Sequence, residues 1–232
     1  MRWYMFCLLL DPIQVHAQEY VKIFDEPTRM WTCEFSGAVD QMCEDHWITT
    51  HWLAGDTVID GTVYQRVASR TSHFQSHILG GPNDCQASSV FAGPTQYVRE
   101  VDGMAFIRLE AGERLLYDIT VQIGDSIPQP SDSSTPWGTP TFVTNWTTVI
   151  AIDSVVVNGT FRKRLIVENE DWWNEVECVI EGIGGGRGPF NALQGHIGIS
   201  HFSELWCVAD HNEVVYGDPN CYFVTSLSER LN

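Results

Sequence analysis

Basic residues are scarce in this chain of 232 residues, which has 13 lysines and arginines against 30 aspartates and glutamates and a formal net charge of −17. Affinity for nucleic acid comes mainly from basic side chains that neutralise phosphates, so the composition excludes nucleic-acid binding. It disfavours binding to an anionic membrane surface for the same reason. We expect the acidity to serve solubility outside the cell rather than recognition of a cationic partner.

Long apolar runs and long stretches of helical periodicity are also missing. The apolar run at Trp3–Leu10 is too short to span a bilayer, and no later segment is long enough, so we predict no transmembrane segment. Arg2 gives a basic start to this run, and Val15–Ala17 resembles a small-residue cleavage site. Residues 1–17 therefore predict a signal peptide, and residues 18–232 a single β-rich domain.

The spacing rules of the common cofactor, metal and nucleophile motifs are not met. The glycine-rich stretch VIEGIGGGRGPF, residues 179–190, fits neither G-x-G-x-x-G nor the P-loop, and no amphipathic helix follows it. We interpret it as a backbone bend in which Arg187, with little side-chain cover, is a candidate binding residue. H-E-x-x-H, G-x-S-x-G and the calcium-loop pattern are absent too, so we predict no cofactor and no metal site.

Histidines and serines give only weak catalytic signals. His73 and His77 are four residues apart, but no third zinc ligand is evident, so we interpret them as loop or surface residues. Ser200 precedes His201, but adjacent residues of a strand point to opposite faces of the sheet. A hydrolase whose serine, histidine and carboxylates meet only in the folded chain stays open.

Seven cysteines are present, and removal of the signal peptide takes away Cys7 and leaves six. An even number of cysteines in an exported chain indicates disulfides, and no C-x-x-C pair indicates structural zinc. Closeness in the sequence favours two of the pairs and leaves the third by elimination: Cys207–Cys221, Cys33–Cys43 and Cys85–Cys178.

Turn-forming dipeptides mark three β-hairpins. Asp60-Gly61, Asp102-Gly103 and Asn158-Gly159 each lie between residues that favour strands. Both central positions of a type I′ turn need positive φ, which Asp or Asn followed by Gly tolerates best.

The third hairpin also predicts a register. A two-residue turn at Asn158-Gly159 places Asp153 opposite Arg164 and Ile152 opposite Leu165, so an ion pair and an apolar pair become cross-strand neighbours.

Further strands are predicted within 115–127 and 204–216, and loops at 69–94 and 128–140. Short strands at regular spacing with turn signals between them indicate an all-β fold. We predict an antiparallel hairpin or meander sheet that forms an open or closed barrel, with a sandwich as the alternative.

Tryptophan is frequent, with nine copies, and Trp172 and Trp173 stand together in the acidic run ENEDWWNEVE. Exposed tryptophans stack on sugars or anchor protein partners. The two residues are therefore candidate binding residues, and core packing beside a solvated acidic loop is the alternative.

In order along the chain, the stretches DTVIDGTVYQRV, YVREVDGMAFIRL, ERLLYDITVQIGDSI, IDSVVVNGTFRKRLIV, CVIEGIGG and LWCVADHNEVVYGDPNC resemble a family of secreted β-rich domains from Bacteroidota. The resemblance covers about Asp56 to Cys221. It implies a signal peptide and often a following type IX secretion sorting domain. The family has no assigned catalytic residues, so no site is implied. The sequence departs from this family at its end, where no sorting domain follows VTSLSERLN, which leaves ordinary export or a truncated gene as the alternatives to type IX export.

We therefore expect a monomer that is secreted or lies at the cell surface, with the periplasm also open, and that acts as a non-catalytic binding or surface-associated module. Its expected partner is a protein or glycan at the cell exterior. The alternatives are a secreted hydrolase and a carbohydrate-binding module that uses Trp172 or Trp173.

Overall fold

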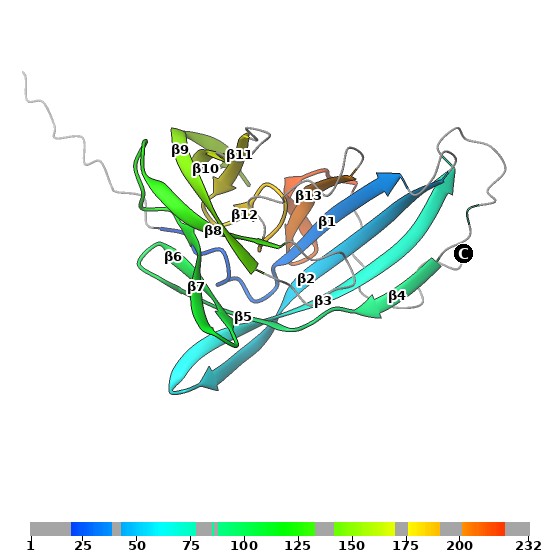
Figure 1. Ribbon diagram of the computed structural model, residues 1–232, viewed down its shortest axis with the longest axis horizontal. Helices are drawn as coiled ribbons and strands as arrows, with labels where there is room; N and C mark the ends of the chain where they lie inside the picture. The colour runs from blue at the N-terminus through cyan, green and yellow to red at the C-terminus, as the bar shows by residue number, and fades with distance from the viewer. Residues whose placement is uncertain are drawn as a thin grey trace, which may run out of the picture.

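The computed structural model describes residues 20–38, 43–77, 85, 88–132, 142–169, 176–190 and 201–220. These residues form two antiparallel β-sheets (Figure 1) and contain no helix, so none that could cross a membrane is found among them. The prediction of an all-β fold is confirmed.

The larger sheet has nine strands: β1 (Met30–Ala38), β2 (Cys43–Ile59), β3 (Thr62–His77), β4 (Ser88–Ala92), β5 (Gln96–Val101), β6 (Met104–Leu109), β7 (Gly112–Asp118), β13 (His201–Asp210) and β14 (Glu213–Gly217). Its order is β14-β13-β1-β2-β3-β5-β6-β7. β4 is outside this order and pairs with residues 70–74 of β3, whereas β5 pairs with residues 65–67. The sheet is not a simple meander, because β13 returns from far along the chain to pair with β1.

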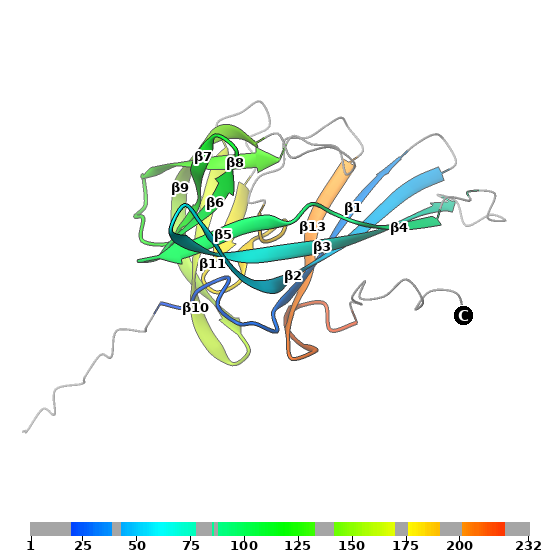
Figure 2. The ribbon, with the colours of Figure 1, turned by 90° about the horizontal axis from the view of Figure 1, so that it is seen from below.

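The smaller sheet has five strands: β8 (Ser126–Asp132), β9 (Phe142–Val157), β10 (Thr160–Asn169), β11 (Val176–Ile180) and β12 (Gly184–Gly185). Its order is β12-β11-β10-β9-β8. In both views this sheet lies at one end of the molecule, and β1 to β4 extend away from it (Figure 2).

The three predicted hairpin turns are confirmed by their backbone. The residue before each turn glycine has a positive φ, which is 50° at Asp60, 51° at Asp102 and 46° at Asn158. Positive φ at both turn positions matches the right-handed twist of the flanking strands.

The predicted register of the third hairpin is also confirmed. Arg164 lies opposite Asp153 and Leu165 lies opposite Ile152. Two N–H groups of the Arg164 side chain donate to the two carboxylate oxygens of Asp153, at 2.8 and 2.6 Å.

Two predicted loops are in part strands. β3 continues to His77 because it pairs with β2 over nearly its whole length and with β4 at its end, so residues 69–77 are not a loop. β8 likewise takes up residues 126–132 through its pairing with β9. In both cases pairing with a distant strand decides the conformation, and local composition does not report it.

The hydrophobic core lies between the sheets. The larger sheet contributes fully buried residues such as Val67 and Ile107, and the smaller sheet contributes Val149, Leu165 and Val167. Each buried aliphatic side chain of this size stabilises the fold by roughly 1.5–3 kcal/mol relative to exposure. One core thus joins strands from both sheets.

The disulfide pairing differs from the prediction. Cys43 is bonded to Cys85, whereas Cys33 and Cys178 are free thiols, so the predicted pairs Cys33–Cys43 and Cys85–Cys178 are wrong. Cys33 lies opposite Thr49 on β2, six residues from Cys43, which is about 20 Å along a strand. Cys207 is disulfide-bonded. Cys221 and the predicted signal peptide lie outside the described residues, so the pairing Cys207–Cys221 and the cleavage stay predictions.

We expect alkylation without reductant to separate the free from the bonded cysteines. At about pH 8 Cys33 should stay unmodified in the folded protein, because burial raises the pKa of its thiol to about 12 and only the thiolate reacts. After unfolding in guanidinium, Cys33 and Cys178 should be alkylated, and Cys43 and Cys85 should be recovered as a bridged peptide by mass spectrometry. A bridged peptide containing Cys33 would contradict this assignment.

Candidate functional site

The N-terminal segment, residues 20–24, is bound by a carboxylate of the larger sheet. Glu100 of β5 accepts hydrogen bonds from the backbone N–H groups of Ile23 (2.9 Å) and Phe24 (2.8 Å) and from the hydroxyl of Tyr20 (2.6 Å). Burial raises the pKa of Glu100, although its three donors oppose this rise. Burial also raises the pKa of Tyr20, and the neighbouring Glu100 carboxylate raises it further. The segment therefore contacts the sheet through buried polar groups.

A second carboxylate binds the same segment to the smaller sheet. Glu181, which follows β11, accepts hydrogen bonds from the backbone N–H of Val21 (2.9 Å) and of Lys163 on β10 (3.1 Å). The Glu181 N–H in turn donates to the Lys163 carbonyl at 2.9 Å. The segment is thus held between the two sheets.

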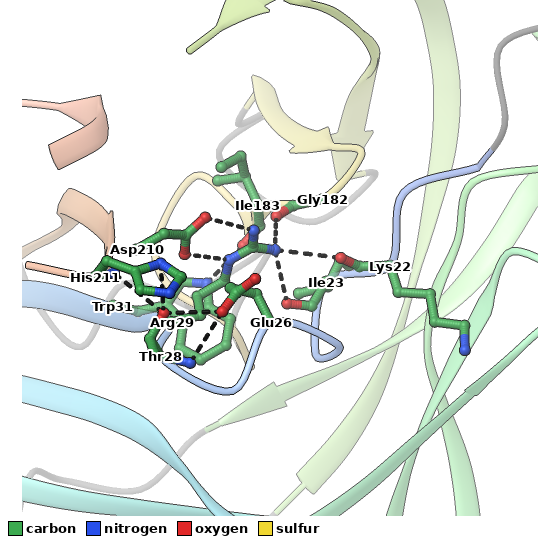
Figure 3. Close-up of polar contacts among 10 residues, drawn as sticks. All are labelled: Lys22, Ile23, Glu26, Thr28, Arg29, Trp31, Gly182, Ile183, Asp210 and His211. Atoms are coloured by element: carbon green, nitrogen blue, oxygen red, sulfur yellow. Dashed lines mark hydrogen bonds and ion pairs between the residues drawn. The ribbon is translucent and has the colours of Figure 1, made fainter. Parts of the chain in front are cut away.

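The guanidinium of Arg29 joins these parts to β13 (Figure 3). One nitrogen, Nη1, donates to the carbonyl oxygens of Lys22 (3.2 Å), Ile23 (3.2 Å) and Gly182 (2.6 Å). Nε and Nη2 donate to the two carboxylate oxygens of Asp210 at 2.9 and 2.8 Å. The residue is only 8% exposed, so its charge is compensated almost entirely within the protein.

The glycine-rich stretch is a bend, and its glycines allow close approach of other segments. Gly182 has a φ of 76°, and a Cβ there would lie 2.9 Å from a methyl carbon of Val21. Gly188 has a φ of 127°, and a Cβ there would lie 2.6 Å from the sulfur of Cys33. A larger residue would displace the N-terminal segment or β1, which explains the glycines without a phosphate ligand.

Arg187, the candidate cation of this stretch, is well covered. It forms an ion pair with Glu177 of β11, and the two side chains are 13% and 14% exposed. The expectation that Arg187 has little side-chain cover is therefore wrong. This contact joins the glycine bend to β11 of the smaller sheet.

A hollow lies where the β9–β10 hairpin meets the N-terminal segment, and we call it the hairpin hollow. It has a volume of about 380 Å³ and is lined by Tyr20, Ile119, Asp153, Ser154, Phe161, Arg162, Lys163 and Glu181. Most of its charged groups already have partners within the protein. The Lys163 ammonium, for example, donates to the carbonyl oxygens of Ile119 (2.7 Å) and Val121 (3.2 Å).

Arg162 differs from the other cations. Among the described lysines and arginines, Arg162 is the one whose side chain has neither a hydrogen bond nor an ion pair. Its side chain lines the hairpin hollow and also an adjoining cavity of about 100 Å³, which Asn158 and Thr160 line as well. The neighbouring Phe161 is 64% exposed. Phe161 and Arg162 are adjacent in β10, so their side chains point to opposite faces of the strand, and both residues border the hairpin hollow.

The candidate histidines His73, His77 and His201 lie on strands and not in loops. His73 and His77 both belong to β3, and His73 Nε2 lies 2.8 Å from a carboxylate oxygen of Asp45. His201 starts β13, while Ser200 lies outside the described residues. Within the described ranges, no group of three or more metal-ligating side chains is found.

Trp172 and Trp173 lie outside the described residues, between the end of β10 and the start of β11. Their binding role stays a prediction. Among the described tryptophans, Trp146 of β9 is the one with a largely exposed side chain, at 60%.

Comparison with protein-family models, with curated proteins and with solved structures gave no match for this chain. The resemblance to secreted domains of Bacteroidota therefore stays a prediction.

The residues that build the site were only partly visible in the sequence. The run Arg162-Lys163-Arg164 is conspicuous in so acidic a chain, but its three members have different roles. Glu181 offered a signal as a carboxylate between an apolar strand and glycines. Arg29 offered none, because its partners outside the N-terminal segment, Gly182 and Asp210, are more than 150 residues away.

We expect Arg29→Met to lower the free energy of unfolding by about 3–5 kcal/mol. The variant leaves the partly buried Asp210 carboxylate, 21% exposed, without its counter-charge, and the carbonyl oxygens of Ile23 and Gly182 without their donor. Urea denaturation measures this change. Arg108→Met is the matched control. Arg108 pairs at 2.9 Å with Asp60, whose side chain is 80% exposed, and removal of such a pair changes stability by about 0–1 kcal/mol. Equal losses in the two variants would contradict the role given to Arg29.

Proposed function

We propose that the protein is a secreted binding module that binds a carboxylate-bearing ligand in the hairpin hollow. The Cys43–Cys85 disulfide supports export, because disulfides persist in oxidising compartments. The observation that carries the proposal is the unpaired guanidinium of Arg162 at this hollow.

Arg162 has the chemistry of an anion receptor. A guanidinium binds a carboxylate through two parallel N–H···O bonds, and such charge-assisted bonds are about twice as strong as neutral ones. In a chain with a net charge of −17, a cation without an internal partner is unusual. The neighbouring Arg164 serves as a contrast, because both of its bonds go to Asp153.

The walls of the hollow suit the uncharged part of such a ligand. Phe161, Ile119 and the ring of Tyr20 offer apolar surface, and Ser154 offers a hydroxyl. Aromatic rings pack against the apolar faces of sugars and against hydrocarbon stems. The volume of about 380 Å³ is at the lower end of ligand pockets, which suits one sugar ring or one amino-acid residue.

The carboxylates of the lining limit the charge of the ligand. Glu181 and Asp153 lie in the same hollow as Arg162, so a dianion such as phosphate would meet more repulsion than a single carboxylate. We therefore favour a uronic-acid residue of a glycan or the carboxyl terminus of a peptide. Both fit a partner at the cell exterior.

The test is titration calorimetry with glucuronate, galacturonate and short peptides with a free carboxyl terminus, each beside its amidated form. We expect binding of at least one carboxylate and a loss of binding on amidation. Arg162→Ala should weaken the affinity roughly 10–100-fold, since a hydrogen bond to a charged group contributes about 1.5–3 kcal/mol. Arg162→Lys should keep part of it, because the charge remains without the planar pair of donors.

Arg108→Ala is the control for the loss of one positive charge, because Arg108 lies at the Asp60 hairpin, outside the hollow lining. The Arg108→Ala variant should bind the carboxylate ligand with the affinity of the wild type. Unchanged binding in Arg162→Ala, or the absence of carboxylate binding at millimolar concentration, would show that the hairpin hollow is not the ligand site.

A further inference from the structure

We propose that Ser76, His46 and Glu34 form a second, hydrolytic site that transfers the acyl group of uncharged esters to water. The Ser76 hydroxyl oxygen lies 2.8 Å from His46 Nε2, and His46 Nδ1 lies 3.0 Å from a carboxylate oxygen of Glu34. A nucleophile, a base and a carboxylate that orients the base are thus connected in the order that acyl transfer requires.

Strand register brings these residues together. His46 of β2 lies opposite Phe74 on β3, two residues before Ser76, and Glu34 of β1 lies opposite Ile48, two residues after His46. Residues two apart on a strand share a face, so all three side chains lie on one face of the sheet. Such diagonal neighbours are about 7–8 Å apart, a distance that polar side chains of this length span.

The imidazole of His46 is held in place on three sides. Both ring nitrogens have partners, and the ring of Phe74 stacks on it with the centroids 4.9 Å apart and the planes 10° from parallel. The side chain is 18% exposed and that of Glu34 26% exposed, so the group is neither dry nor freely solvated. The ring is therefore oriented before any substrate binds.

The carboxylate selects the useful tautomer. An ionised Glu34 accepts only, so the Nδ1 beside it must carry the proton. Nε2 of the neutral ring then has a free lone pair and accepts the Ser76 O–H. The Glu44 carboxylate lies 3.8 Å from Nε2, and it would attract the positive charge that the ring gains with a second proton.

The reaction needs no co-reactant besides water. The Ser76 oxygen forms a bond to the ester carbonyl carbon while its proton passes to His46 Nε2. The bond from that carbon to the alkoxy oxygen breaks, and the departing alcohol takes the proton from Nε2. A water molecule then attacks the acyl-serine, gives one proton to Nε2, and releases a carboxylic acid as Ser76 regains its proton.

The carboxylates around His46 and the expected rate acceleration define the substrate class. Glu34 and Glu44 flank the histidine, so an anionic ester would be repelled and an uncharged one is favoured. A positioned general base accelerates such a reaction roughly 10²–10⁴-fold. Activated esters of short acids, such as p-nitrophenyl acetate, are therefore the suitable first substrates. This site does not depend on Arg162, which lies on the smaller sheet.

The experiment is active-site labelling with an uncharged fluorophosphonate, followed by peptide mapping, alongside p-nitrophenyl acetate hydrolysis. We expect the folded wild-type protein to be labelled at Ser76. Ser76→Ala should abolish both labelling and ester hydrolysis above the buffer rate, and His46→Gln should lower the labelling rate at least 100-fold. Ser126→Ala, at an exposed serine of the smaller sheet, should leave both rates unchanged.

Glu34 acts through His46, so its test separates positioning from folding. Glu34→Gln should lower the maximal labelling rate at least 10-fold without a change in the probe concentration that gives half of it. Arg162→Ala should be labelled like the wild type, which keeps this site distinct from the proposed carboxylate site. The proposal is overturned if Ser76 is not labelled in the folded wild-type protein, a result that needs no variant. It is also overturned if His46→Gln is labelled as fast as the wild type.

Discussion

The buried guanidinium of Arg29 is the interaction on which the arrangement of this protein depends. It donates to carbonyl oxygens of the N-terminal segment and of the glycine bend and to the Asp210 carboxylate at the end of β13. These three parts are far apart in the sequence: the glycine bend follows β11 of the smaller sheet, and Asp210 ends β13 of the larger sheet. Because each unpaired polar group would carry a desolvation cost, the parts are stable only together. As a consequence, the N-terminal segment is held where its Tyr20 lines the hairpin hollow.

The same principle explains how an acidic chain uses its few cations. Arg29, Arg164 and Arg187 each pair with a carboxylate, and Lys163 binds two backbone carbonyls, so these charges hold the fold. Arg162 is left with its donors free at the hairpin hollow. The other described lysines and arginines have partners within the protein. Arg162, as the one exception among the described residues, is therefore informative. The proposed ligand chemistry follows from that exception.

Much of the fold could be predicted from residues that are neighbours in the sequence. Most of the site could not, because its residues come from parts of the chain that are far apart in the sequence. The hairpins at Asp60, Asp102 and Asn158 and the pairing of Asp153 with Arg164 depend on neighbouring residues, so composition reveals them. The end of β3 carries polar side chains on both faces and reads as a loop until β2 lies beside it. Contacts such as Ser76 with His46 depend on that pairing. The cysteine pairs failed likewise, because closeness along the chain is not closeness across a sheet.

Native-state hydrogen exchange in wild type and Arg29→Met tests most directly whether one guanidinium holds these parts together. The amides of Val21, Ile23 and Phe24 donate to Glu181 and Glu100, not to Arg29. If the arginine holds the segment between the sheets, these amides lose far more protection in the variant than the core strands lose. If they keep protection in proportion to the global stability, while only the surroundings of Asp210 change, the segment is held by its carboxylates alone and the account is contradicted.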